Sequence, residues 1–394
     1  MEKKERKVIN MMQEFSIPLI LGVVLSLIWA NLGHHSYHEF LHYEPFGIKY
    51  LSFHFLFNDI FMVFFFGIAA VEITQSVLPG GDLNPMSKAV NPLMATAGGV
   101  LGPIGVFFFL NAMIGSPELN NGWGIPTATD IALAWLVARM VFGAKHPAVS
   151  FLLLLAIADD AIGLVIIAIF YPTPGIPVMP MYIGITVVGM LIAFGLRKGG
   201  VKNFWPYVLF AGGIAWFGLF KAGIHPALAL VFIVPFMPSQ QPAKEGGEAH
   251  IMEEVEGEHS TLVSFEHSFK LFVDVGLLGF GLSNSGVLLG GIETLTIIIL
   301  LSLLIGKTVG VFLFSTIASV AFKAPLPTGM KRRDLFVAGI IAALGLTVAL
   351  FVSGQAFENT SPHQSGAKMG ALLSVVAGVI AIILGKILKI EKKN

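Results

Sequence analysis

The chain has 394 residues, of which 55% are hydrophobic and 12% are charged, and its mean hydropathy is +0.81. A soluble protein of this size carries roughly twice that charged fraction, so the composition excludes an ordinary soluble domain and indicates a helical membrane protein. The formal net charge is zero, which gives no reason to expect nucleic acid as a partner. The predicted partner is the lipid bilayer. The absence of cysteine excludes disulfides, thiolate metal sites and cysteine nucleophiles.

Apolar segments recur along the whole chain and predict an all-α polytopic membrane protein with about twelve transmembrane helices. The predicted spans are approximately 14–33, 55–79, 91–114, 123–141, 148–170, 179–196, 204–219, 223–238, 265–285, 292–318, 334–356 and 366–388. No small-residue cleavage site follows the first apolar run, so we interpret it as a retained span rather than a signal peptide. Residues 1–394 are therefore expected to form a single transmembrane domain.

The basic residues test this count through the positive-inside rule. With a cytoplasmic N-terminus, the twelve spans place 19 of the 24 Lys and Arg residues on the cytoplasmic side, three on the other side and two within spans. The bias is lost if one span is added or removed early in the chain. The sequence therefore predicts that both termini are cytoplasmic, and the absence of a targeting signal fits the inner membrane of a bacterium.

The stretch HHSYHEFLH places His34, His38 and His42 at helical i, i+4 spacing on the outer side. Three imidazoles with this spacing can bind zinc. No convergent carboxylate cluster accompanies them, so zinc binding is the weaker interpretation of this segment.

The fourth predicted span is interrupted by polar residues in the stretch GIPTATDIALAW, residues 124–135. Pro126 breaks the helix, and Thr129 and Asp130 follow it inside an otherwise apolar segment. Hydroxyl groups and free carbonyls at such a break can satisfy the backbone or coordinate a cation. An acid inside a span is a functional hypothesis by default, so Asp130 is a candidate site residue.

The fifth span contains two adjacent acids, Asp159 and Asp160, about ten residues from the polar flank on either side, which puts them near the bilayer midplane. Neighbouring residues on a helix project about 100° apart, so one acid can face a cavity while the other faces a packed partner. A buried carboxylate can hold either a proton or a hard cation such as sodium, which is the chemistry of exchange. The alternative is a structural ion pair with a lysine on another span.

The insert at 238–261 is acidic and contains histidine, so it can sense pH or cations on the cytoplasmic side, although a plain flexible loop is the simpler interpretation. The next span carries Glu266, Lys270 and Asp274 at i, i+4 and i+8, which favours a ladder of ion pairs on one helix face.

Lys307 lies deep in the apolar stretch LLIGKTVGV, residues 303–311. An unpaired ammonium there is prohibitive, so it requires a carboxylate or the carbonyls at a helix C-terminus, and Asp159 or Asp160 is the obvious partner. The eleventh span is weakened at Gly345 and Thr347, as the fourth is at Thr129. Two weakened helices, one in each half of a chain, indicate a binding site near the midplane, although glycine at such a position also permits close helix packing.

These features, in this order, resemble the NhaA-type sodium/proton antiporter family over nearly the whole chain. The resemblance is carried by the stretches FNDIFMVFFFGIAAVEI (57–73), GIPTATDIALAW (124–135), LLAIADDAIGLVIIAIFY (154–171), KAGIHPALALVFIVPFMP (221–238), FEHSF (265–269), SNSGV (283–287), LLIGKTVGV (303–311) and GIIAALGLTVALFVSGQAF (339–357). It implies twelve spans in two inverted-topology repeats, with the two broken helices crossing near the midplane. It also implies a homodimer, to which the outer loop with the histidines contributes.

The resemblance further implies a role for each site residue. Asp160 is the principal ligand of sodium or lithium, with Asp159 beside it, and Lys307 pairs with Asp159. Asp130 and Lys307 offset the helix dipoles at the crossing, where Thr129 also lies. The implied activity is electrogenic exchange that extrudes sodium in return for protons and contributes to sodium and pH homeostasis, with no cofactor.

A response to pH is implied for Glu72, His225 and Glu266. Glu72 is followed by ITQSVLPGG and so lacks the basic residue that the family commonly has there, which puts the pH profile in doubt. His225 lies near a predicted span end, where an interfacial histidine is the alternative.

Two other functions fit part of the pattern. An intramembrane aspartyl protease needs two acids facing each other across one water, whereas Asp159 and Asp160 splay apart and no G-x-G-D element occurs. Coupled transport of an organic anion needs a free cationic group at the site, and Lys307 already has a partner. The sequence has no phosphate-binding loop, so the expected driving force is an ion gradient, and we expect a transporter rather than an enzyme. The choice between sodium and potassium stays open.

Overall fold

The computed structural model describes residues 17–393 except 46, 49–50, 85, 174–175, 240–259, 291 and 358–360. The described residues form helices and connecting segments, with no β-strand among them. The basic N-terminal residues and most of the predicted 238–261 loop lie outside the described residues.

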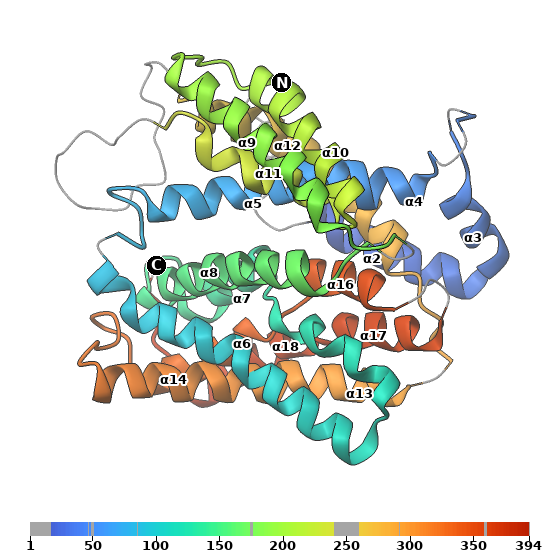
Figure 1. Cartoon of the computed structure of the whole chain (residues 1–394). Helices are drawn as coiled ribbons and strands as arrows, with labels where there is room; N and C mark the ends of the chain where they lie inside the picture. Colours follow the sequence, from blue (N-terminus) through green and yellow to red (C-terminus); the bar gives the residue numbers. More distant parts are fainter. Residues whose placement is uncertain are drawn as a thin grey trace, which may run out of the picture.

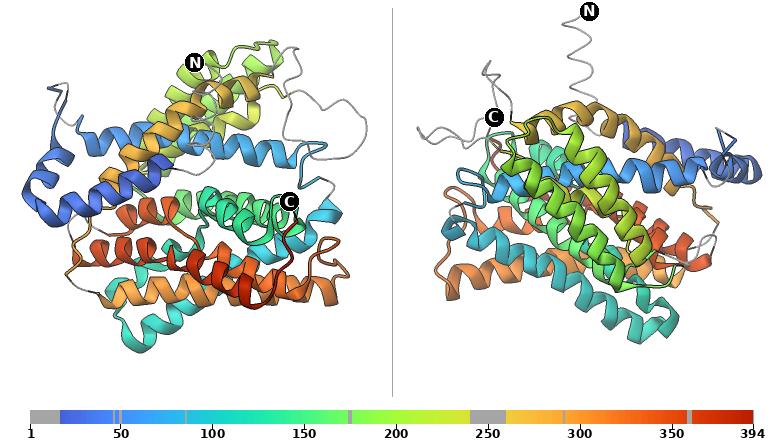
Figure 2. Two further views of the ribbon diagram at one scale, coloured as in Figure 1. Left: turned by 180° about the vertical axis from the view of Figure 1, so that it is seen from behind. Right: turned by 45° about the horizontal axis from the view of Figure 1, so that its top comes forward.

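The helices fall into two groups that lie one above the other in Figures 1 and 2. The first group consists of α2 (Ile17–Leu32), α3 (His34–His42), α4 (Phe53–Phe55), α5 (Met62–Val77), α9 (Ile183–Lys198), α10 (Gly213–Ala222), α11 (Ala229–Ile233) and α12 (Thr261–Asn284). The second consists of α6 (Met86–Ile114), α7 (Ile131–Phe142), α8 (Pro147–Phe170), α13 (Thr294–Leu301), α14 (Thr308–Ala321), α15 (Arg332–Ala342), α16 (Thr347–Ala356), α17 (Pro362–Leu373) and α18 (Val376–Ile387). The groups meet where α5 packs on α8 and α12 packs on α16.

Tighter and wider helical turns join or extend these helices. The 3₁₀ segments are Pro117–Thr127, Pro180–Tyr182, Pro226–Leu228 and Val234–Phe236, and the π-helical segments are Leu56–Phe61, Tyr207–Gly212 and Ser302–Lys307. The last π-helical segment ends at the buried lysine, and such bulges are frequent at functional sites.

The membrane character of the chain is confirmed by six helices that are long and apolar enough to cross a bilayer. They span Phe53–Val77, Ala89–Ile114, Pro147–Phe170, Pro180–Lys198, Thr294–Ala321 and Pro362–Ile387. Three shorter apolar helices cover Ile17–Leu32, Tyr207–Ala222 and Pro226–Phe236. The 24-residue helix α12 carries Glu266, Lys270 and Asp274, which lower its apolar character. The chain is thus a multi-pass membrane protein, and the count of twelve spans stays a prediction.

Two of the predicted spans are bent pairs rather than continuous helices. The predicted span 123–141 consists of Pro117–Thr127 and α7, bent by 56°, and the predicted span 334–356 consists of α15 and α16, bent by 46°. In the first pair, Asp130 caps α7 by accepting a hydrogen bond from the backbone N–H of Leu133, at 3.1 Å. The polar residues that interrupt the apolar pattern therefore lie where the helix stops and starts again.

Helices α6 and α14 approach closely because glycines face each other along their contact. A Cβ atom on Gly98 or Gly102 would collide with the backbone of Gly310 or Gly306. In lipid the hydrophobic effect does not drive helices together, so their association depends on the van der Waals packing that such small residues permit. This contact holds the helix that carries Lys307 against α6 within the second group.

Candidate functional site

The two broken helices touch each other at their breaks. The backbone N–H of Asp130 donates to the carbonyl of Leu344 at 2.6 Å, and the hydroxyl of Thr129 donates to the carbonyl of Ala342 at 2.9 Å. These bonds satisfy backbone groups that each helix leaves free where it stops, which is a requirement inside a bilayer. The interruptions predicted from two distant stretches therefore form one structure.

Asp130 lies at two helix N-termini at once. One carboxylate oxygen accepts the cap bond of α7, and the other accepts from the backbone N–H of Thr347 at 3.3 Å and from the Thr347 hydroxyl, at the start of α16. A negative charge beside helix N-termini is stabilising because the N–H dipoles there point toward it. Asp130 thus offsets the positive ends of both helix dipoles, and Thr347 supplies two of the hydrogen-bond donors to its carboxylate.

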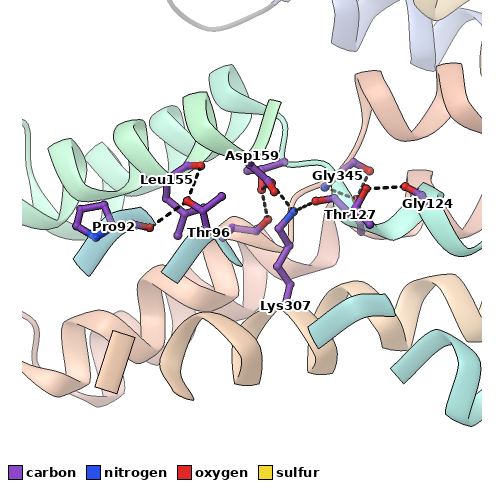
Figure 3. A network of polar contacts seen from close by, with 11 residues as sticks. Pro92, Thr96, Gly124, Thr127, Leu155, Asp159, Lys307 and Gly345 are labelled. Atoms are coloured by element: carbon purple, nitrogen blue, oxygen red, sulfur yellow. Dashed lines mark hydrogen bonds and ion pairs between the residues drawn. The ribbon is translucent and has the colours of Figure 1, made fainter. Parts of the chain in front are cut away.

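Lys307 lies at a helix C-terminus of the break, whereas Asp130 lies at helix N-termini. Its ammonium group donates to the carbonyl of Thr127, the last residue of the preceding 3₁₀ segment, and to Oδ2 of Asp159 at 2.6 Å (Figure 3). The side chains of Lys307 and Asp159 are both 0% exposed. The residue pattern left Asp159 or Asp160 as the partner and the family resemblance implied Asp159, and the structure has Asp159 in the ion pair.

The two acids of the doublet have different surroundings. Asp159 Oδ2 also lies 2.7 Å from the Thr129 hydroxyl, whose single hydrogen it shares with the Ala342 carbonyl, so three segments of the second group meet at one oxygen. Asp160 instead lines a small cavity of about 10 Å³, the room that one water occupies. One further oxygen of each acid, Oδ1, is buried and makes no hydrogen bond among the described residues. These two oxygens are the free acceptors of the site.

The cavity beside Asp160 lies between the two groups of helices. Its other walls are Phe65, Phe66 and Ala69 on α5, Leu164 on α8 and Val348 on α16. The cavity is therefore lined from both groups, and Asp160 is the acid in its wall.

Gly345 occupies a confined position at the second break. A Cβ atom there would lie 2.8 Å from the carbonyl oxygen of Ala128 and 3.0 Å from the side chain of Leu303. The Ser374 hydroxyl accepts from the N–H of Gly345 at 3.2 Å and donates to its carbonyl at 3.0 Å. Gly345 is therefore closely packed, and the same packing brings the two breaks together.

Sequence reasoning missed three residues that support the site: Ser374, Thr96 and Tyr171. Thr96 on α6 donates to the carbonyls of Pro92 and of Leu155 on α8, at 3.0 and 3.3 Å (Figure 3). The Tyr171 hydroxyl accepts from the N–H of Gly124 and donates to the carbonyl of Asn121, both at 2.8 Å. A lone hydroxyl residue inside or at the end of an apolar span was the signal available for all three.

His225 is buried within the protein, with 2% of its surface exposed. Its Nε2 lies 3.8 Å from Oδ1 of Asp59, in the first group of helices, and its ring contacts Phe351 on α16 edge to face. Glu72 interacts electrostatically with Glu266 and with Lys270, and also with Asp160 of the doublet.

The outer histidines form no metal centre. The His38 and His42 rings lie 4.5 Å apart, and within the described ranges no group of three His, Asp or Glu side chains is placed to hold a metal ion. The zinc interpretation of His34, His38 and His42 therefore has no structural support.

A multi-pass helical protein whose buried acids and lysine meet at broken helices belongs to the class of membrane transporters rather than enzymes. The model of the family described as Na+/H+ antiporter 1 matches residues 6–386. Two similar proteins, each named Na(+)/H(+) antiporter NhaA, are 60% identical over 388 residues in Desulfitobacterium hafniense (strain DSM 10664 / DCB-2) and 56% identical over 389 residues in Geotalea uraniireducens (strain Rf4). Each alignment covers 98% of this chain and 98% of the relative. The chain belongs to the NhaA-type sodium/proton antiporter family.

Proposed function

We propose that the protein exports sodium, and also lithium, in exchange for protons, and that Asp160 is the group that alternately holds the cation and a proton. One observation carries the proposal: Asp160 lines a cavity between the two groups of helices, and its buried Oδ1 makes no hydrogen bond among the described residues. Carboxylate oxygen is the ligand type that hard monovalent cations prefer, and protonation of the same oxygen excludes the cation. Family membership and the names of the relatives support the same activity.

Asp159 is proposed to join the exchange through its ion pair with Lys307. Release of Asp159 Oδ2 from the ammonium would give the cation a second carboxylate, next to the free Oδ1. Because Asp159 is ionised in the pair, the two protons that leave for one monovalent cation come from Asp160 and from the freed Lys307 ammonium, and their loss leaves a net charge on the transport cycle. This arithmetic supports electrogenic exchange, with more protons moved inward than sodium ions outward.

The broken helices are proposed to supply the fixed electrostatics of the site. Asp130 compensates the N-termini of α7 and α16, and Lys307 compensates the C-terminus at Thr127. Thr129 links Asp159 to α15, while Gly345 and Thr347 hold the second break against the first. Alternating access then follows from movement of one helix group against the other, because the cavity wall is shared between them.

The rest of the architecture is proposed on the family membership and on charge. We infer one transporter domain of twelve spans with inverted repeats, in a homodimer in the bacterial inner membrane, with both termini in the cytoplasm. We also infer regulation by pH, for which Glu72, His225 and Glu266 are the candidate groups, and a role in sodium and pH homeostasis. The competing protease function does not suit the geometry, because Asp159 is bonded to Lys307 while Asp160 faces a different space.

Exchange is tested with the purified protein in liposomes that carry an imposed proton gradient and a lumenal pH dye. Addition of sodium or lithium should collapse the gradient in the wild type and in Asp82→Asn, a loop variant distant in sequence from the site. Asp160→Asn, inserted and folded normally, should give no response. Exchange by Asp160→Asn at the wild-type rate would refute the site, and a folded wild type without any cation response would refute the function.

A further inference from the structure

The helix that carries the acid doublet begins at a histidine–proline pair. His146 is the N-cap of α8, and its Nδ1 accepts a hydrogen bond from the backbone N–H of Ala148 at 3.1 Å. The imidazole is 4% exposed and stacks on the ring of Phe142, with centroids 5.2 Å apart. A ring nitrogen that accepts a hydrogen bond carries no proton, so this cap exists only while His146 is neutral, with its proton on Nε2.

The other nitrogen of the same ring faces an acid on a broken helix. His146 Nε2 lies 3.9 Å from Oδ2 of Asp334, which is 3% exposed and lies in the first turn of α15. Asp334 Oδ2 also accepts from the backbone N–H of Lys331 at 2.7 Å. His146 therefore sits between the start of the helix that holds Asp159 and the start of the helix that leads to the second break.

The C-terminal end of the described chain packs over this position. The backbone N–H of Lys393 donates to the carbonyl of Phe142 at 2.8 Å, and the backbone N–H of Lys145 donates to the carbonyl of Lys393 at 2.9 Å. Gly143, with a φ of +84°, allows this approach, because a Cβ atom there would lie within 2.8 Å of Lys393 backbone atoms. His146 is thus enclosed by α7, α8, α15 and the C-terminal segment.

We propose that His146 is a positioning residue that makes the stability of the first turn of α8 depend on the pH at this face of the protein. Protonation places a proton on Nδ1, so that two hydrogen-bond donors, the Nδ1–H of His146 and the N–H of Ala148, point at each other. The cap hydrogen bond is then lost. The same protonation creates a charge attracted to Asp334, which draws the ring toward α15. Neutral His146 fixes the first turn of the helix with the doublet, and protonated His146 releases it.

Burial decides the direction in which the pKa of His146 shifts, and the charged groups around the ring modify the shift. Burial lowers the pKa of His146, Asp334 raises it, and Lys393 lowers it, with smaller effects of Glu391 upward and Lys331 downward. Glu391 in turn lies 3.7 Å from the ammonium of Lys331. Because the folded-state pKa lies below the ordinary value of 6.5, the cap contributes stability at neutral pH and above, and that stability is lost as the pH falls through the range below 6.5.

A second histidine–proline pair in this chain has the same geometry. His225 precedes Pro226, and its Nδ1 accepts from the backbone N–H of Ala227 at 3.2 Å, while its Nε2 faces Asp59 at 3.8 Å. The acceptor arrangement is therefore a local consequence of the His-Pro sequence, since proline at N1 presents the next free N–H to the cap side chain. What distinguishes His146 is its place directly before the helix that carries the acid doublet, under the C-terminal segment.

The cap is tested directly by hydrogen exchange and mass spectrometry on the full-length protein. Asparagine is a good N-cap whose side-chain oxygen cannot be switched off by a proton in this range, so His146→Asn is the matched variant. In the wild type, exchange in the peptide from 147 to 155, corrected for the intrinsic rate, should rise about fivefold from about pH 8 to about pH 5, the effect of losing a cap of about 1 kcal/mol. His146→Asn should show no such rise. A rise in His146→Asn equal to that of the wild type, or no rise in the wild type, would overturn the cap switch.

The link to transport rests on the proposed function and has its own readout. Protons that compete at the doublet raise the KM for sodium, whereas a loosened α8 lowers the maximal rate at saturating sodium. We expect the maximal rate of the wild type to fall about fivefold more than that of His146→Asn over the same acidification. Identical profiles would refute the coupling to transport. An inactive wild type would instead refute the antiport proposal, while hydrogen exchange would still decide the cap.

Discussion

Replacement of Lys307 by methionine removes one partner of a buried ion pair and leaves the other charged. The ammonium and Asp159 Oδ2 are 2.6 Å apart with both side chains fully buried, so no solvent screens the pair. Removing one partner of such a pair costs about 3–5 kcal/mol, because the remaining charge is left uncompensated. We expect a value near the lower end, about 3 kcal/mol, because Asp159 keeps its hydrogen bond from Thr129.

The same reasoning predicts strong coupling between the two positions. Asp159→Asn leaves the ammonium with the Thr127 carbonyl as its remaining bonded partner among the described residues, and should also cost about 3 kcal/mol. The double variant Lys307→Met with Asp159→Asn contains neither unpaired charge, so its cost should be well below the sum of the single costs. The expected coupling energy is about 2 kcal/mol or more.

The assay is the free energy of unfolding of the purified protein in one fixed detergent, measured by denaturant titration for the wild type, the two single variants and the double variant. Lys221→Met, at an exposed position, serves as the control and should change the free energy of unfolding by less than about 0.5 kcal/mol. Additive single costs would show that the close contact carries little energy and would refute the reasoning.

Two other substitutions probe how the helices are held together. Gly98→Val should prevent normal folding, because the valine side chain would collide with the backbone of Gly310. The control Gly105→Val, on the same helix, places its Cβ atom where no other atom lies within 4 Å and should fold. Equal yields of monodisperse protein from the two variants would contradict this. Tyr171→Phe should lower the free energy of unfolding by about 1–3 kcal/mol, because the substitution leaves the buried N–H of Gly124 without its acceptor. An unchanged denaturation midpoint would contradict this prediction.

Local sequence features carried much of the fold prediction. Composition and apolar runs predicted a helical multi-pass protein, and the bent pairs lie at the stretches where proline, threonine and glycine interrupt the hydrophobic pattern. These features are local: a proline lacks an N–H, and the backbone it frees must be satisfied nearby whatever the helix packs against. The helix limits were less predictable, as in the fourth span, where the helical turn starts at Pro117 rather than at the predicted 123.

The sequence by itself determined the kinds of group that the site contains. Two adjacent acids, a lysine and a second acid in apolar spans must be paired or functional, because the bilayer makes an isolated charge too costly. The residue pattern left open which acid binds Lys307 and which one faces the cavity, and only the family resemblance implied Asp159 for the pair. The tertiary structure makes this choice through the rotation of α8 about its axis, which packing against α6, α7 and α5 sets. The same holds for Ser374 and for His146, whose partners lie on other helices and come close only when the helices of the second group pack together.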